Sequence, residues 1–106
     1  MKIERFDIVL VKLNPTVGHE IQKTRPCIVV SPNEINMLKT AIIAPLTSRG
    51  FDFVFRPKIC FQEKDGLVLL DQIRAVDKSR IAKKIGKVEK EKAKEISEIL
   101  VEMFRE

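Results

Sequence analysis

The stretch Phe6–Leu13, whose sequence is FDIVLVKL, consists mostly of β-branched and aliphatic side chains. Short runs of this composition are typical of β-strands. Three later runs have a similar character: PCIVVS at Pro26–Ser31, TAIIAPL at Thr40–Leu46 and LVLL at Leu67–Leu70. Because these runs are nearly continuously apolar, they are consistent with strands in the interior of a sheet. The chain is therefore expected to be rich in β-structure.

Weaker signals fill the spaces between these runs. Phe51–Phe55 (FDFVF) alternates and predicts a further strand, and Gln72–Val76 is expected to continue the strand that begins at Leu67. Lys64-Asp65-Gly66 is a turn signal, and residues 14–24 (NPTVGHEIQKT) form a long polar loop. Ser31 followed by Pro32 predicts one helical turn.

The C-terminal part of the chain has a different periodicity. Apolar residues recur there at helical spacing and predict an amphipathic helix over Glu89–Phe104 that covers one side of the sheet: Ala93, Ile96, Ile99, Leu100, Met103 and Phe104. Several short strands followed by one helix indicate an α+β, mostly β fold, a compact antiparallel barrel with a helical cap. With 106 residues, we expect a single domain over residues 1–106.

The composition excludes several classes of protein. Hydrophobic residues make up 44% and charged residues 33% of the chain, as in ordinary globular proteins. No apolar run approaches the roughly 20 residues that span a bilayer. The polar start, Met1–Asp7, lacks the features of a secretory signal, so we expect a cytoplasmic protein with no membrane partner.

The net charge of +5 is unevenly distributed. Lys87–Glu106 carries five basic and six acidic residues, whereas the rest of the chain carries 15 basic and nine acidic residues. The segment Arg74–Lys84 is especially basic. This surplus suits a polyanionic partner, although charge alone is equally consistent with a role in solubility.

The two cysteines, Cys27 and Cys60, both lie in apolar, strand-like segments. Since the chain has no CxxC pair and only one histidine, we expect neither a zinc site nor any other metal or cofactor. Two buried, reduced thiols are the simplest interpretation. A cysteine nucleophile paired with His19 remains an alternative, but nothing in the sequence orients His19 toward either thiol.

Three blocks of the sequence resemble the MazF/PemK family of toxins. They are DIVLVKLNPTVGHE at 7–20 with TRP at 24–26 and VVSP at 29–32, then APLTSR at 44–49, and then LDQIRAVDKSR at 70–80. The blocks occur in the family's order and spacing and cover nearly the whole chain. The resemblance implies an SH3-like antiparallel barrel of the CcdB/PemK type. It also implies a homodimer, cleavage of single-stranded RNA at short sequences, and a cognate antitoxin that occupies the RNA groove.

Cleavage of RNA without a metal uses the adjacent 2′-OH as nucleophile and leaves a 2′,3′-cyclic phosphate and a 5′-OH end. The enzyme must move two protons and stabilise charge on the phosphoryl oxygens. Arg25 suits the last task because a guanidinium can bind phosphate through two nitrogens, and the resemblance aligns it with a catalytic arginine. From the residues alone, a surface arginine in an ion pair with Glu20 or Glu4 is the favoured interpretation, and the family resemblance reverses this preference.

The second catalytic residue implied by the resemblance is Thr47, whose hydroxyl can donate a hydrogen bond to a phosphoryl oxygen. The neighbouring Ser48 is the alternative residue that could supply this hydroxyl group. The alternative interpretation is an ordinary threonine at the end of a strand.

Two residues are candidates for proton transfer, because an arginine does not readily lose its proton. His19, the only histidine of the chain, is of the residue type most often used for proton transfer, and it has an equivalent that helps to bind or cleave RNA in some family members. Asp71 matches an acidic residue proposed as the base in others, but those members carry an arginine where this chain has Leu69. Asp71 is therefore also compatible with a structural role, either paired with Arg74 or bound to backbone N–H groups.

RNA binding requires base recognition as well as positive charge. We expect the RNA-binding residues to be Glu20, Gln22, Ser48, Arg49, Gln72 and Arg74. Phenylalanines can stack on bases, and four of them lie near the expected binding loops: Phe51, Phe53, Phe55 and Phe61. The alternation at 51, 53 and 55 instead favours a place in the core for most of them.

Other functions remain open at this point. The same fold could belong to a CcdB-like toxin that poisons DNA gyrase through its C-terminal helix, to a non-catalytic nucleic-acid-binding barrel, or to an interaction module. None of these would require both the Thr24-Arg25-Pro26 block and the Pro45-Leu46-Thr47-Ser48 block.

Overall fold

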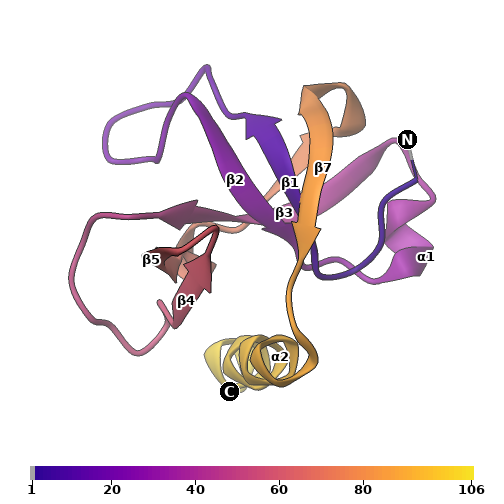
Figure 1. The fold of residues 1–106 in the computed structure, drawn as a ribbon. Helices are drawn as coiled ribbons and strands as arrows, with labels where there is room; N and C mark the ends of the chain where they lie inside the picture. The colour runs from indigo at the N-terminus through magenta and orange to yellow at the C-terminus, as the bar shows by residue number, and fades with distance from the viewer. Residues whose placement is uncertain (1) are drawn as a thin grey trace.

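The computed structural model describes residues 2–106, which form a curled antiparallel sheet with a helix beneath it (Figure 1). The elements in chain order are β1 (Asp7–Lys12), β2 (Thr24–Val29), α1 (Asn33–Asn36), β3 (Thr40–Thr47), β4 (Lys58–Phe61), β5 (Lys64–Val68), the 3-10 turn η1 (Leu70–Gln72), β6 (Arg74–Asp77), the 3-10 turn η2 (Lys78–Arg80), β7 (Ile81–Lys87) and α2 (Lys90–Phe104). The four strong strand predictions and the predicted helix are confirmed, each to within a few residues at its ends.

The sheet has the strand order β4-β5-β3-β2-β1-β7 and is antiparallel throughout. β3 is the longest strand. One of its edges pairs with β2, and the other edge pairs with two strands: Thr40–Ile43 pair with β6, whereas Leu46 and Thr47 pair with β5. The sheet therefore curls at β3 into a half-barrel. Its two edge strands approach each other where Phe61 of β4 lies against Gly86 of β7.

Both faces of the central strands are buried. On β1, Ile8 belongs to a core shared with α2 and the β4–β5 hairpin, whereas the neighbouring Val9 belongs to a second core on the opposite face. Ile28 and Val29 on β2 are divided in the same way. A strand covered on both sides has no solvent-exposed face, which explains why these runs are continuously apolar.

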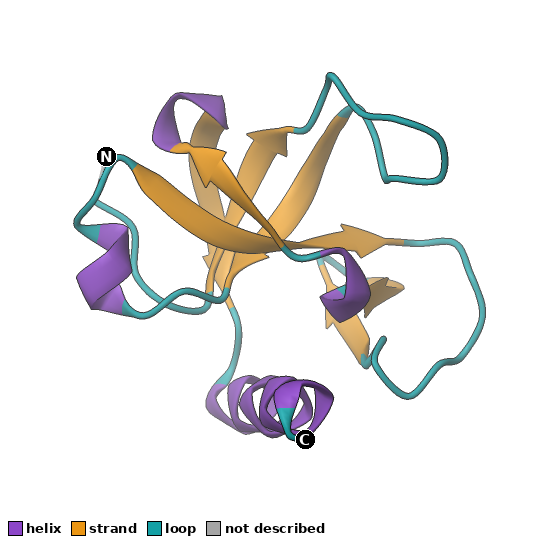
Figure 2. Cartoon of the chain, turned by 180° about the vertical axis from the view of Figure 1, so that it is seen from behind, coloured by secondary structure: helices purple, strands orange, loops and turns teal. Residues whose placement is uncertain are grey.

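Helix α2 lies across the open side of the half-barrel (Figures 1 and 2). Its residues Ala93 and Ile96 are buried in the first core. The helix begins at Lys90 with Glu89 as its N-cap residue, within one residue of the predicted start. None of the helices formed by residues 2–106 has the length and apolar character that a membrane crossing requires.

Three predictions for the middle of the chain are wrong. Gln72–Val76 does not continue the strand that contains Leu67, because β5 ends at Val68 and the 3-10 turn η1 separates it from β6, which pairs with β3. Phe51–Phe55 is not a strand; it lies in an irregular loop, residues 48–57, that contains one isolated bridge between Phe53 and Arg56. Lys64-Asp65-Gly66 is not the turn but the start of β5, and the chain reverses at Gln62 and Glu63, with φ of 52° and 63°. Left-handed backbone at two successive turn residues usually selects asparagine and glycine, so this turn gave no recognisable sequence signal.

β4 and β7 were not predicted. β7 carries three exposed lysines, and two of them, Lys84 and Lys87, approach the carboxylate of Asp7 at 3.3 and 3.5 Å. Asp7 is fully buried, and its Oδ2 accepts a hydrogen bond from the backbone of Glu4 at 2.8 Å. A buried carboxylate thus joins the start of β1 to the end of β7.

Candidate functional site

The candidate site lies where β2 and β3 part. Their ladder ends at the pair Cys27–Pro45, although β2 begins three residues earlier at Thr24 and β3 continues to Thr47. If the pairing of β2 with β3 continued for two more residues in the same register, Arg25 would lie opposite Thr47. Instead the end of β3 turns to pair with β5, and the strands diverge (Figure 1). The gap is a cavity of about 220 Å³, here called the Arg25 cleft, lined by residues that include Arg25, Pro26, Leu46, Ser48, Phe61 and Lys64.

Arg25 is held through its backbone and its Nε atom, which leaves its two terminal nitrogens unpaired among the described residues. It pairs with Val11 in the β1–β2 ladder, and its Nε donates a hydrogen bond to the carbonyl of Gln22 at 3.1 Å. Within residues 2–106, Arg25 forms no ion pair with Glu20 or Glu4, and the Glu20 carboxylate accepts a hydrogen bond from the backbone of Val17 at 2.6 Å. The terminal guanidinium nitrogens bond to no other residue in the described part of the chain, so they can donate hydrogen bonds to an anion.

Thr47 ends β3 between Leu46 and Ser48, which line the Arg25 cleft, but Thr47 is not itself one of the lining residues. Its hydroxyl oxygen accepts a hydrogen bond from the backbone N–H of Arg49 at 3.1 Å, and its proton remains available for donation. Behind it lies Gly66 of β5, where a Cβ atom would be only 2.7 Å from the Thr47 carbonyl oxygen. A glycine at 66 therefore lets β3 and β5 approach closely enough to hold Thr47 in place.

The loop at residues 13–23 carries three of the predicted site residues, His19, Glu20 and Gln22, all of them exposed. It leaves the sheet on the same side as the loop at residues 48–57 (Figures 1 and 2). The structure thus gathers the residues predicted from the first two sequence blocks on one side of the half-barrel.

Side chains of the third block hold this loop in place. Arg74 donates to the carbonyl of Leu13 at 3.2 Å, and Arg80 donates to the carbonyls of Lys12 and Asn14 at 3.1 and 2.7 Å. Gln72 accepts a hydrogen bond from the backbone of Ile21 at 2.9 Å. Gln72 and Arg74, predicted to contact RNA, are therefore engaged with the protein's own backbone. Arg80 lies in the same sequence block, but the sequence did not predict its role in holding this loop.

Asp71 does not pair with Arg74, as had been considered, but with Arg56. Arg56 donates from Nε and Nη2 to the two carboxylate oxygens at 3.0 and 2.8 Å. This charge-assisted pair lowers the pKa of Asp71 below its ordinary value and raises that of Arg56. Arg56 is the residue that sequence reasoning missed. It lies 15 positions before Asp71, in a segment predicted to be a strand, so no local pattern connected the two.

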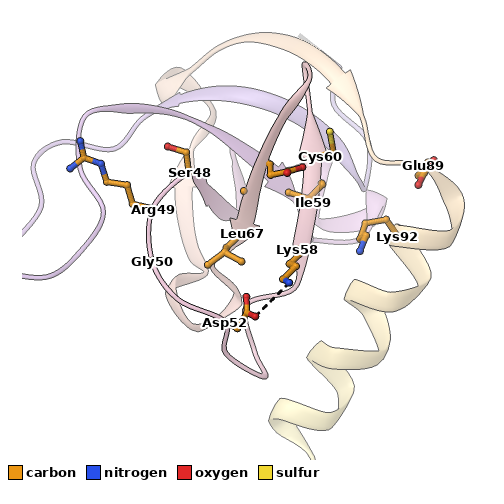
Figure 3. Close-up of a pocket in the computed structure, with 12 residues that line it drawn as sticks. Ser48, Arg49, Gly50, Asp52, Lys58, Ile59, Cys60, Leu67, Glu89 and Lys92 are labelled. Carbon is orange, nitrogen blue, oxygen red and sulfur yellow. Dashed lines mark ion pairs between the residues drawn. The ribbon is translucent and has the colours of Figure 1, made fainter.

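A larger cavity of about 590 Å³ adjoins the site between the loop at residues 48–57, the β4–β5 hairpin and the start of α2 (Figure 3). Its charged lining is balanced, with Arg49, Lys58 and Lys92 against Asp52, Asp65 and Glu89. Lys58 and Asp52 approach to 3.5 Å (Figure 3). A cavity lined equally by both signs does not by itself favour a polyanion.

The two cysteines have different environments. Cys27 is buried as predicted, and burial raises the pKa of its thiol to about 12. The prediction for Cys60 is wrong: it is exposed on edge strand β4, at the rim of the larger cavity (Figure 3). Across residues 2–106, no three His, Cys, Asp or Glu side chains gather in a way that could hold a metal ion.

The curled half-barrel with a C-terminal helix defines the class as that of the MazF-like toxin fold. It superposes with a TM-score of 0.84 on the crystal structure of MazF (Form-I) from Deinococcus radiodurans, covering 97% of this chain and 96% of that chain at 24% sequence identity. The sequence profile described as "PemK-like, MazF-like toxin of type II toxin-antitoxin system" matches residues 4–104. The chain therefore belongs to this toxin family.

Two relatives support the assignment. The endoribonuclease toxin ChpB of Escherichia coli (strain K12) is 40% identical over 93 residues, which cover 80% of this chain and 79% of ChpB. The endoribonuclease PemK of Escherichia coli is 35% identical over 94 residues, covering 81% of this chain and 70% of PemK.

Proposed function

We propose that this protein is a sequence-specific endoribonuclease toxin that cleaves single-stranded RNA without a metal ion. The observation that supports this most directly is the Arg25 cleft: an arginine whose terminal nitrogens are unpaired among residues 2–106 lines the same cavity as Leu46 and Ser48, the two neighbours of Thr47. Two relatives of the same toxin family, ChpB and PemK, are named as endoribonucleases.

In the proposed reaction, the substrate's 2′-oxygen attacks the adjacent phosphorus and the 5′-oxygen of the next nucleotide leaves. Arg25 binds the phosphoryl oxygens and stabilises the charge that develops on them, while the Thr47 hydroxyl donates a further hydrogen bond. Ser48 is placed to assist Thr47 or to bind a neighbouring phosphate. A cation and a hydroxyl supply this stabilisation without Lewis-acid assistance.

The reaction also moves two protons: one leaves the 2′-OH, and one arrives at the departing 5′-oxygen. Asp71 is a weak base because its pair with Arg56 lowers its pKa. His19, the chain's single histidine, is exposed on the loop at residues 13–23. We therefore assign proton transfer to His19 or to water, in preference to Asp71.

RNA contacts are assigned to Glu20, Gln22, Ser48 and Arg49, which are all exposed around the cleft. Gln72 and Arg74 contribute by holding the loop at residues 13–23. The protein is further proposed to act in the cytoplasm as a homodimer, under the control of a cognate antitoxin. The family description, which is that of a toxin–antitoxin system, supports the antitoxin.

The test incubates the purified protein with a long single-stranded RNA in EDTA, beside the Arg25→Ala and Thr47→Ala variants. Thr40→Ala, at the opposite end of β3, and Arg105→Ala, in α2's C-cap, are matched controls. We expect wild type and both controls to cut at a few short sequences and to leave 5′-OH ends, which a polynucleotide kinase labels directly. The two site variants should lose at least about a hundredfold in rate while remaining folded. Intact RNA across many sequence contexts would overturn the proposal, and gyrase inhibition would be assayed next.

A further inference from the structure

The loop at residues 48–57 carries aromatic side chains that the core does not use. Phe51 is 71% exposed and Phe53 is 47% exposed. The guanidinium carbon of Arg56 lies 5.9 Å from the centre of each of these two rings. We propose that Phe51, Phe53 and Arg56, here called the aromatic platform, stack against unpaired nucleobases of single-stranded RNA. This inference deepens the proposed function and rests on it.

The platform is ordered before any ligand binds. The backbone N–H of Arg56 donates to the carbonyl of Phe53 at 2.9 Å, which closes a tight turn. The rings of Phe53 and Phe55 meet edge to face, with centroids 6.1 Å apart. The two hydrogen bonds from Arg56 to Asp71 join the turn to η1. A surface held in this way loses little conformational entropy on binding.

The chemistry of the platform favours nucleobases over the apolar side chains of a protein partner. Aromatic rings and arginine side chains together form the surfaces on which single-stranded nucleic acids stack, and the interaction tolerates any base. Outside Lys87–Glu106 the chain carries 15 basic and nine acidic residues, and this surplus complements a phosphate backbone.

The platform is also continuous with the Arg25 cleft. Ser48 lines that cleft, and Gly50 follows it with a φ of 115°. A Cβ atom at Gly50 would lie 3.8 Å from Nη1 of Arg56, so the sharp bend at Gly50 brings the platform back toward the end of β3. An RNA strand with one phosphate at Arg25 can therefore extend its flanking bases over Phe51 and Phe53.

The chain contains no tryptophan or tyrosine, which permits a direct optical test. Phe51→Trp introduces a single tryptophan into the platform, and Phe104→Trp introduces one at a phenylalanine of α2 that is 69% exposed. Both proteins are titrated with a fully 2′-O-methylated RNA oligonucleotide, which cannot be cleaved, and with an abasic oligomer of equal length and charge. We expect the RNA to quench the fluorescence of Phe51→Trp and not that of Phe104→Trp, and the abasic oligomer to quench neither.

Binding and cleavage by Phe51→Ala, Phe53→Ala and Phe51→Leu complete the test, with Phe104→Ala as the matched control. Loss of a stacked ring should weaken RNA binding by about tenfold. Phe51→Leu should bind as weakly as Phe51→Ala, because leucine keeps the apolar surface but not the aromatic face. Thermal melts of the Phe51 variants should remain unchanged, because this ring is 71% exposed, whereas Phe53→Ala is compared with wild type at a temperature well below its melting transition.

The outcomes separate this inference from the proposed function. If wild type cleaves RNA but Phe51→Trp is not quenched and Phe51→Ala binds as tightly as wild type, the platform is overturned and the nuclease stands. If wild type does not cleave RNA but the fluorescence of Phe51→Trp is quenched by RNA and not by the abasic oligomer, base stacking on the aromatic platform is supported and the proposed nuclease activity is wrong. If the phenylalanine variants change only self-association in sedimentation experiments, the surface binds a second copy of the chain and the inference is wrong.

Discussion

Arg56 forms a two-point hydrogen-bonded ion pair with Asp71, from Nε to Oδ1 at 3.0 Å and from Nη2 to Oδ2 at 2.8 Å. The pair joins the loop at residues 48–57 to the segment between β5 and β6. Both side chains are partly exposed, at 21% and 32%, so solvent screens the interaction. Its consequence is mainly geometric, because it fixes the loop that follows Thr47.

The first prediction concerns Asp71→Asn. The pair lowers the pKa of Asp71, so the carboxylate is ionised throughout the neutral range and its contribution to stability is lost only as the pH falls below the ordinary value of 3.8. We expect the variant to retain cleavage within about tenfold of wild type and to keep the same pH–rate profile near neutrality. A loss of more than about a thousandfold together with a missing limb of the profile would identify Asp71 as the general base.

A double-mutant cycle of Arg56→Ala and Asp71→Ala measures the pair itself. We expect a coupling free energy of about 1 kcal/mol in urea denaturation, at the upper end for exposed pairs because the geometry is bidentate. The coupling should shrink in high salt, where the charges are screened. Additive single-variant effects would show that the two side chains do not interact in solution.

A third prediction compares two glycines that both lie in strands. A Cβ at Gly66 would meet the backbone oxygen of Thr47 at 2.7 Å, whereas a Cβ at Gly86 would meet the ring of Phe61 at 2.9 Å. Backbone in a sheet cannot move without breaking its pairing, but a half-buried ring can rotate. We expect Gly66→Ala to destabilise the fold by about 1–3 kcal/mol and Gly86→Ala by clearly less.

These glycines also differ in their distance from the proposed chemistry. Gly66→Ala should lower the cleavage rate of the protein that remains folded, since it displaces Thr47, and Gly86→Ala should not. Adding Phe61→Leu should restore stability to Gly86→Ala and leave Gly66→Ala unchanged. Equal effects of the two substitutions on cleavage would contradict the role assigned to Gly66.

A fourth prediction concerns Arg80, which donates to the carbonyls of Lys12 and Asn14. Arg80→Ala removes two hydrogen bonds that tie the loop at residues 13–23 to the sheet. We expect faster hydrogen exchange across this loop and a loss of about 1 kcal/mol in stability. Arg105→Ala, whose arginine contacts Glu102 on α2, should leave exchange in the loop unchanged. An unaltered loop in Arg80→Ala would show that other contacts suffice to hold it.

The strands that were predicted correctly are the ones that the core covers on both sides. Their burial requires continuous apolar runs, which are visible without knowledge of their neighbours. β4 and β7 are edge strands whose lysines and glycine follow no such pattern, so only the curled sheet reveals them. Phe51–Phe55 alternates like a strand, but Gly50 bends the chain away from the sheet before any pairing can form.

The candidate site was predictable to a similar extent. Arg25 and Thr47 were predicted through the family resemblance, and the end of the β2–β3 ladder at Cys27–Pro45 explains why Arg25 and the neighbours of Thr47 line one cleft. The pairing of Asp71 with Arg56 and the anchoring of the loop by Arg80 depend on contacts across 15 and 66–68 positions. Such contacts arise from tertiary packing, and no local spacing encodes them.

The last prediction uses the contrast between the two thiols. Cys27 is completely buried, and burial raises the pKa of its thiol to about 12, whereas Cys60 is exposed on an edge strand. Only a thiolate attacks a disulfide reagent, so at pH 8 the folded protein should release one equivalent of thiol rapidly and the second only on unfolding. Cys60→Ser should abolish the rapid reaction, and Cys27→Ser should leave it intact.

The same contrast predicts how stability depends on alkaline pH. In the folded state Cys27 keeps its proton up to about pH 12, whereas its ordinary pKa is 9.0. Its contribution to stability is therefore complete below pH 9 and is progressively lost as the pH rises toward 12, because the unfolded chain releases the proton first. Between pH 9 and pH 12, the free energy of unfolding should therefore decrease less with pH in Cys27→Ala than in Cys60→Ala. Two thiols that react equally fast at pH 8 in the folded protein would show that β2 opens readily, and the packing described for the second core would then be wrong.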